Sequence, residues 1–111
     1  MKILKEENNI RSFDDLRNGQ EFKFVEDYKF HNMRDFAEHY CKIFTPDVLT
    51  EAFNSGDLEW REESDGWNVY ITKGTSLTAK GHYGFCLTHN KRFSLYTLTY
   101  KVFDYLRLVQ R

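Results

Sequence analysis

The chain has 111 residues, of which 41% are hydrophobic and 17% aromatic, a size and composition typical of one globular domain. Its 16 basic and 17 acidic residues nearly balance, and with so many aromatic side chains this excludes a disordered chain. The longest stretch without a formal charge, Gly81 to Asn90, is about half of the ~20 apolar residues that a membrane-spanning helix needs. We therefore expect no transmembrane helix.

The N-terminus and the cysteines indicate the compartment. Lys5, Glu6 and Glu7 follow directly after Met-Lys-Ile-Leu, so no apolar segment of a secretory signal is expected. Cys41 and Cys86 lack CxxC spacing and fit a reducing compartment better than a disulfide scaffold. The sequence therefore predicts a cytoplasmic protein.

Charge is divided along the chain. Residues 1–71 carry 9 Lys and Arg against 16 Asp and Glu, whereas residues 72–111 carry 7 against one, Asp104. The acidic residues are densest at 57–65. Such a division steers a charged partner toward one face, unless folding brings the two parts together and they neutralise each other.

The first predicted elements are a helical turn and a strand. Ser12 caps a turn that ends at Gly19. A strand over residues 21–26 should follow. Phe22 and Phe24 share one face of this strand, and Tyr28 and Phe30 continue the same period of two.

Two helices are predicted next. Apolar residues at steps of three and four indicate an amphipathic helix from Asn32 to Phe44. A second helix runs from Pro46 to Ser55, with Thr45 as its N-cap and Gly56 just beyond its end.

A β-hairpin is the clearest local prediction and spans Leu58 to Ile71. Apolar residues alternate around the turn Glu63-Ser64-Asp65-Gly66, in which Asp-Gly supplies left-handed backbone positions. Trp60 and Trp67 flank this turn, so we expect them to stabilise the hairpin by contact across the strands.

The C-terminal part is less clearly patterned. Residues 73–84 contain three Gly and several Thr or Ser, which favours a loop, and residues 83–88 favour a short strand. Leu95, Leu98 and Val102 begin a series at helical steps that predicts a helix from about 94 to 110. The Thr and Tyr content also permits strand up to about residue 101.

These elements predict a single α+β domain over residues 1–111: short helix, strand, two helices, β-hairpin and C-terminal helix. Over residues 12–73 this order resembles the winged-helix arrangement, in which a helical pair is followed by a hairpin wing. The resemblance implies nucleic-acid binding, but Asp47 and Glu51 on the second helix and five acidic residues on the wing would repel phosphates.

No cofactor or metal is expected. His82, Cys86 and His89 are competent ligands within eight residues, and Cys41 or His39 would complete a tetrahedral site. Their spacing matches no standard zinc module, and on a strand at 85–88 His89 points away from the other two.

The sequence shows no catalytic constellation either. On a helix, His39 and Cys41 do not face each other, and Glu62 and Glu63 flank an exposed turn where nothing would raise a carboxyl pKa. The segment beginning Lys73-Gly74 lacks the glycine that a P-loop places before its lysine. We therefore expect no enzymatic activity.

The basic, aromatic C-terminal third carries the functional signal. We expect a non-enzymatic regulatory or interaction protein that binds a protein partner. The predicted partner-binding residues are Lys80, Tyr83, Lys91, Arg92, Tyr96 and Lys101. One alternative is a nucleic-acid-binding regulator in which the same residues stack on bases and contact phosphates, and another is a small enzyme whose site is assembled from distant residues. Such a small domain would also suit a phage or mobile-element protein that inhibits a host factor.

Overall fold

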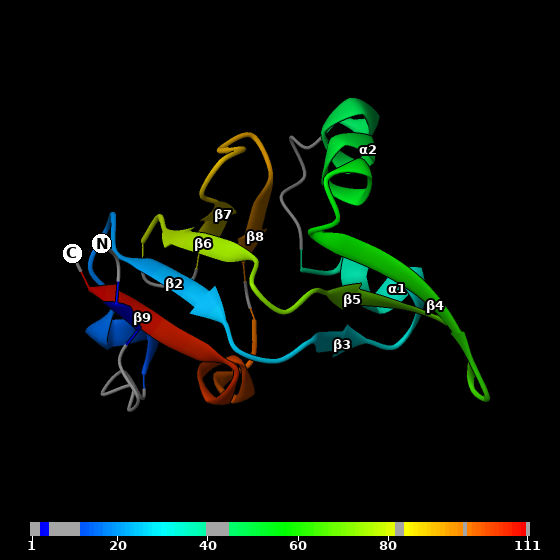
Figure 1. Cartoon of the computed structure of the whole chain (residues 1–111), viewed down its shortest axis with the longest axis horizontal. Helices are drawn as coiled ribbons and strands as arrows, with labels where there is room; N and C mark the ends of the chain where they lie inside the picture. The colour runs from blue at the N-terminus through cyan, green and yellow to red at the C-terminus, as the bar shows by residue number, and fades with distance from the viewer. Residues whose placement is uncertain (1–2, 5–11, 40–44, 82–83, 97, 111) are drawn as a thin grey trace.

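The structure is a computed structural model that describes residues 3–4, 12–39, 45–81, 84–96 and 98–110. Its strands form two antiparallel sheets, seen side by side in Figure 1. The six-stranded sheet has the order β1 (Ile3–Leu4), β9 (Leu106–Gln110), β2 (Glu21–Phe24), β6 (Ser76–Ala79), β7 (Gly84–Leu87) and β8 (Ser94–Tyr96). The three-stranded sheet has the order β3 (Tyr28–Phe30), β5 (Gly66–Ile71) and β4 (Leu58–Glu63). The helices are η1 (Phe13–Asp15), α1 (Asn32–Ala37), α2 (Pro46–Asn54) and η2 (Tyr100–Asp104).

Both sheets contribute to one hydrophobic core. Its largest fully buried side chains include the phenylalanines of several elements, Phe22, Phe24, Phe30, Phe36, Phe85 and Phe93. Within it the Phe30 ring of β3 packs edge-on against the Phe36 ring of α1, with centroids 5.2 Å apart. A shared core of strands and helices confirms the predicted α+β class.

The aromatic strand pattern of residues 22–30 is buried as predicted but belongs to two strands. β2 lies in the six-stranded sheet and β3 in the three-stranded sheet. Between them the Val25 N–H donates to the Tyr105 carbonyl (2.8 Å), and the Asp27 carboxylate accepts the Lys73 N–H (2.7 Å). These bonds satisfy the backbone where the chain leaves one sheet for the other.

The predicted hairpin is confirmed. β4 and β5 pair from Leu58 opposite Ile71 to Glu63 opposite Gly66. Gly66 has a φ of +110°, a conformation that other residues rarely adopt. The sequence therefore located both the strands and the glycine of the turn.

The helices are confirmed in position, but the first is shorter than predicted. The Asn32 side chain accepts the Asp35 N–H, and the Asp35 carboxylate accepts the His31 N–H, both at 3.0 Å. α1 ends at Ala37, where the Glu38 N–H is shared between several carbonyls, a pattern common at helix ends. Residues 40–44 of the predicted helix lie outside the described part.

The C-terminal helix predicted for residues 94–110 is wrong, as is the loop predicted throughout 73–84. Residues 76–79 form β6, residues 94–96 form β8, and β9 follows η2. β9 lies between β1 and β2, where Leu108 faces Phe22 across the sheet. Pairing with a strand some 85 positions earlier in the chain therefore overrides the local helical spacing.

The winged-helix arrangement is not confirmed. The two helices are followed by the β4–β5 hairpin, but the described molecule is dominated by sheet, and the six-stranded sheet has no place in the predicted order. Its strands come from both ends and the middle of the chain.

Candidate functional site

Two tryptophans stand out on the β4–β5 hairpin, which projects from the molecule in Figure 1. Trp60 is 39% exposed and Trp67 54% exposed, and with Tyr100 they are the exposed large hydrophobic residues of the described chain. Most other aromatic side chains of this structure are buried. Burial against the core therefore does not account for these two indoles.

Strand alternation explains where the two indoles lie. Leu58 on β4 and Val69 and Ile71 on β5 occupy the same hairpin face and are buried. Trp60 and Trp67 continue that face toward the turn. The apolar face of the hairpin therefore extends beyond the part that is buried.

The indoles form a defined structure that we call the aromatic corner, Trp60 and Trp67. Their ring centroids are 6.4 Å apart and their planes are at 87°. The ring of Phe53 from α2 stacks on Trp60 with centroids 5.7 Å apart and planes 6° apart. An open apolar cavity of about 430 Å³ is lined by the two indoles.

The opposite face of the hairpin carries a paired polar network. The Tyr70 hydroxyl donates to the Glu63 carboxylate (2.6 Å), and the buried Asn68 amide donates to Glu63 (2.9 Å) and to Asp65 (2.7 Å). The Lys29 ammonium lies 3.4 Å from both carboxylates. Chiefly through the Tyr70 bond, this network holds the pKa of Glu63 below its ordinary value.

Arg61 joins this network to the body of the molecule. Its guanidinium lies over the Tyr70 ring, 4.1 Å from the centroid, and donates to Asp27 (2.9 Å) and Glu59 (2.8 Å). The pKa of Asp27 is lowered, first by the Lys73 backbone N–H and also by Arg61. The network ties the hairpin to the β2–β3 bend on the face opposite the aromatic corner.

Glu62 differs from the other acidic residues of the hairpin. It lies directly opposite Trp67 and two positions from Trp60, so its side chain shares their face. Within the described ranges its carboxylate forms no ion pair or hydrogen bond, whereas Glu59, Glu63 and Asp65 all have partners. An unpaired negative charge therefore borders the aromatic corner.

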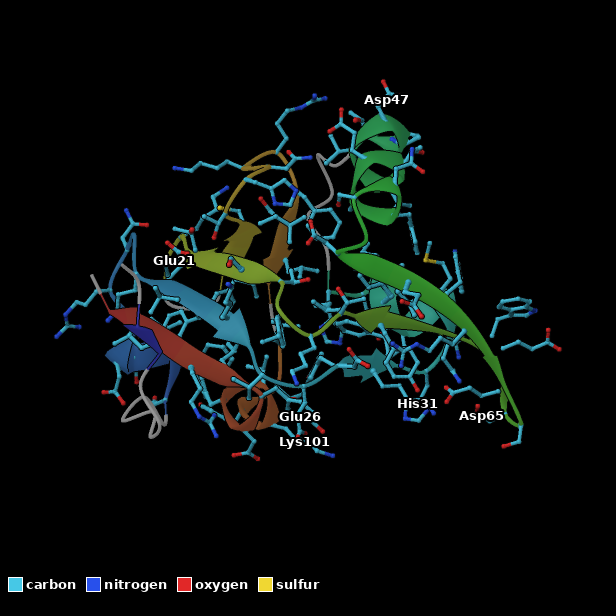
Figure 2. All side chains as sticks on the ribbon, in the orientation of Figure 1. Glu21, Glu26, His31, Asp47, Asp65 and Lys101 are labelled. Atoms are coloured by element: carbon cyan, nitrogen blue, oxygen red, sulfur yellow. The ribbon has the colours of Figure 1, made fainter. Side chains whose placement is uncertain are left out.

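The four predicted partner-binding residues whose side chains the structure describes, Lys80, Lys91, Arg92 and Lys101, lie on different elements. Lys80 donates to the Ser94 hydroxyl (3.3 Å), and Lys91 is exposed in the β7–β8 turn. Arg92 is exposed in the same β7–β8 turn as Lys91. Lys101 lies on η2 at the bottom of the view in Figure 2, whereas the β7–β8 turn lies at the top. The Tyr83 position and the side chain of Tyr96 lie outside what the structure describes.

Lys101 instead lines a separate cavity of about 330 Å³, together with Tyr28, Lys29, His31 and Tyr105. Asp65 lies beside this cavity, with its carboxylate 3.5 Å from His31 Nδ1 (Figure 2 labels both residues) and 3.4 Å from Lys29. The cationic side chains of this cavity are therefore partly neutralised by the acidic hairpin.

The acidic segment also contacts the basic third directly. Asp57 accepts hydrogen bonds from Ser55 (2.9 Å) and Thr75 (3.2 Å), and His89 Nε2 lies 3.0 Å from its carboxylate. The Asn90 amide donates to Glu51 of α2 (2.8 Å). The β7–β8 turn is thus attached to the end of α2 and the start of β4.

Cys86 and His89 are the described members of the predicted metal-ligand cluster around residues 82–89. Burial raises the pKa of the Cys86 thiol, and the imidazole of His89 is directed to Asp57. Among the described residues no group of three or more His, Cys, Asp or Glu is arranged to hold a metal ion. His82 and Cys41 lie outside that part of the chain.

No family model, curated protein or solved structure matches this chain. No helix in the described ranges is long and apolar enough to cross a membrane. The candidate site therefore depends on geometry alone. The predicted contact between Trp60 and Trp67 is present, but the sequence signal for their exposure is only that Trp67 adjoins the turn glycine Gly66.

Proposed function

We propose that this chain is a non-enzymatic interaction domain that binds a protein partner through the aromatic corner. The observation that carries the proposal is the exposure of two tryptophans on one face of a hairpin whose opposite face is hydrogen-bonded. Tryptophan is enriched among the few residues that supply most of the binding energy at protein interfaces. A support that already orders the two rings lowers the entropy cost of binding.

The hairpin suits this role because its two faces have separate tasks. Hydrogen bonds among Glu63, Asn68 and Tyr70 order one face, and on the other face the Phe53 ring stacks on Trp60. A partner would then bury indole surface without having to order it. The proposal places the main contact on Trp60 and Trp67 and assigns Lys80, Lys91 and Arg92 at most a peripheral part.

The proposal includes a regulatory role in the cytoplasm, where occupying a surface of the partner would inhibit it. The free, buried thiol of Cys86 supports a reducing compartment. An accessory protein that blocks a host factor would act in this way.

Photo-crosslinking tests the proposed function. A photoreactive phenylalanine at position 67 of the full chain, expressed in cells, should yield a discrete crosslinked partner protein. The same group at position 100 is the matched control, because Tyr100 is 63% exposed but lies on η2. Trp67→Ser should then weaken binding of the purified partner at least tenfold, and Tyr100→Ser should leave it unchanged. Equal crosslinking from both positions would contradict the proposal.

Nucleic-acid binding through the basic third is the second candidate, the role that a winged-helix regulator would have. The observation that favours it is that Lys91 and Arg92 are adjacent and exposed in the β7–β8 turn, while Lys80 reaches Ser94 at the start of β8. Phosphate contacts would make affinity fall steeply with salt. Strong binding to generic single-stranded RNA at physiological salt, unaffected by Trp67→Ser, would favour this candidate.

A further inference from the structure

The geometry of the aromatic corner suggests the chemistry of the group that it binds. Phe53 covers one face of Trp60, and Trp67 stands at 87° to that ring. The two indoles therefore line two sides of a recess of about 430 Å³ that is otherwise open. An open recess admits a flat side chain better than it encloses a spherical one.

The charge beside the recess favours a cation. The face of an indole carries negative potential and attracts cations. Glu62, opposite Trp67 on the same face, contributes a carboxylate that has no partner among the described residues. A cation placed between the indoles and Glu62 would contact an indole face and the Glu62 carboxylate at the same time.

The same hairpin shows which cation fits such a set of groups. On its opposite face, the Arg61 guanidinium lies over the Tyr70 ring while donating to the carboxylates of Asp27 and Glu59. Guanidinium is planar, stacks on aromatic rings and donates to a carboxylate through two N–H groups, which ammonium does not. The aromatic corner and Glu62 offer the same combination of a ring face and a carboxylate.

We propose that the aromatic corner and Glu62 bind an arginine side chain of the partner protein, with the guanidinium on an indole face and its N–H groups on the Glu62 carboxylate. This inference rests on the proposed function, since it names the residue that the same surface recognises. It also assigns Glu62 a binding role distinct from the structural roles of Glu59, Glu63 and Asp65.

The test uses the full chain and two synthetic peptides, acetyl-Gly-Arg-Gly-Arg-Gly-amide and its twin with citrulline in place of arginine. Citrulline keeps the shape of the side chain and removes the charge. Both tryptophans of the chain belong to the aromatic corner, so intrinsic fluorescence and the two indole N–H signals in NMR report directly on it. We expect saturable shifts with the arginine peptide and binding about tenfold weaker with citrulline.

Variants of Glu62 test whether its carboxylate binds the arginine side chain. Glu62→Gln should weaken binding of the arginine peptide about three- to tenfold, and Glu62→Lys should abolish it. Asp104→Asn is the matched control, because it removes one negative charge from exposed η2 and should have no effect. Circular dichroism checks that each variant is folded.

The outcomes separate this inference from the proposed function. If the crosslinked partner loses affinity on Trp67→Ser but the two peptides bind equally, or Glu62→Gln changes nothing, the arginine inference is wrong and the proposed function stands. An equally tight lysine peptide would also overturn it, because recognition would then need only a point charge. If Trp67→Ser leaves partner binding intact, both fail.

Discussion

The Phe53 ring of α2 and the Trp60 indole of β4 lie nearly parallel, with planes 6° apart and centroids 5.7 Å apart. This stack links the second helix to the hairpin at the edge of the core, against which Phe53 packs. It covers one face of Trp60 and leaves the indole 39% exposed. The helix therefore supports the aromatic corner without burying it.

Loss of this support should be visible in the fluorescence of the chain. Phe53→Ala should destabilise the fold by about 1–3 kcal/mol, because Phe53 is partly buried and loses one ring contact with Trp60. Trp60 should become more solvated, shifting the emission to longer wavelength. Urea unfolding and emission spectra measure the two effects. Unchanged emission would mean that the stack does not persist in solution.

Substitution of Gly66 should destabilise the hairpin because of the backbone conformation at this position. A Cβ at this position would have nothing within 4 Å, so no clash opposes it, but the φ of +110° is strained for other residues. Gly66→Val should therefore cost about 1–3 kcal/mol and disturb the Trp signals. Ser64→Ala, in the same exposed turn, should change stability by less than about 0.5 kcal/mol. Equal unfolding midpoints for the two variants would refute the turn geometry.

Asp57 should be important for stability because three side chains bond to it. Asp57→Ala leaves the part-buried Thr75 hydroxyl, Ser55 and His89 without this acceptor, and should cost about 1–3 kcal/mol. His89→Ala removes only one bond from a histidine that is 56% exposed, so its effect should be below about 1 kcal/mol. Denaturant unfolding of both variants measures the difference. A larger loss for His89→Ala would reverse this order.

Stability should fall in acid through the hairpin network. The pKa of Glu63 lies below its ordinary value of 4.5, chiefly because of the Tyr70 hydroxyl. A carboxyl whose pKa is lower in the folded state stabilises the fold above its unfolded pKa, and this stabilisation is lost as pH falls through the folded pKa. The lowered pKa values of Asp27 and Asp65 act in the same direction.

Tyr70→Phe isolates the contribution of Glu63. The variant should raise the Glu63 pKa toward 4.5 and flatten the fall in stability below that pH, measured by NMR titration of the carboxyl and by unfolding between pH 3 and 7. Tyr100→Phe removes a hydroxyl on η2, away from Glu63, and serves as control. An unshifted Glu63 titration in Tyr70→Phe would show that the hydroxyl does not stabilise the carboxylate.

Reversing the exposed charges of the β7–β8 turn tests the choice of partner. Lys91→Glu with Arg92→Glu should change stability by less than about 1 kcal/mol per residue, because both residues are exposed. Binding of a partner that is recognised by the aromatic corner should be retained. Loss of binding, with a flatter salt dependence toward RNA, would favour the nucleic-acid alternative.

Local sequence determined the elements whose signals are contained within a few residues. Pro46 and Gly56 bound α2, Gly66 marks the hairpin turn, and period-two aromatic residues mark β2 and β3. Each depends on steric preference or strand alternation, which act between neighbours in the chain. The sequence by itself also predicted the contact between Trp60 and Trp67 across the hairpin.

The tertiary structure decided what depends on distant partners. The apolar residues before Leu106 are spaced as in a helix, yet Leu106 and Leu108 belong to β9. The reason is that β2 supplies backbone hydrogen-bond partners, with Phe24 opposite Leu106 and Phe22 opposite Leu108. The sequence also did not determine how exposed the aromatic corner is. That exposure depends on the position of α2, whose Phe53 covers one face of Trp60 while Trp67 stays half exposed. Strand pairing and burial arise between segments far apart in the chain, so local periodicity could predict neither.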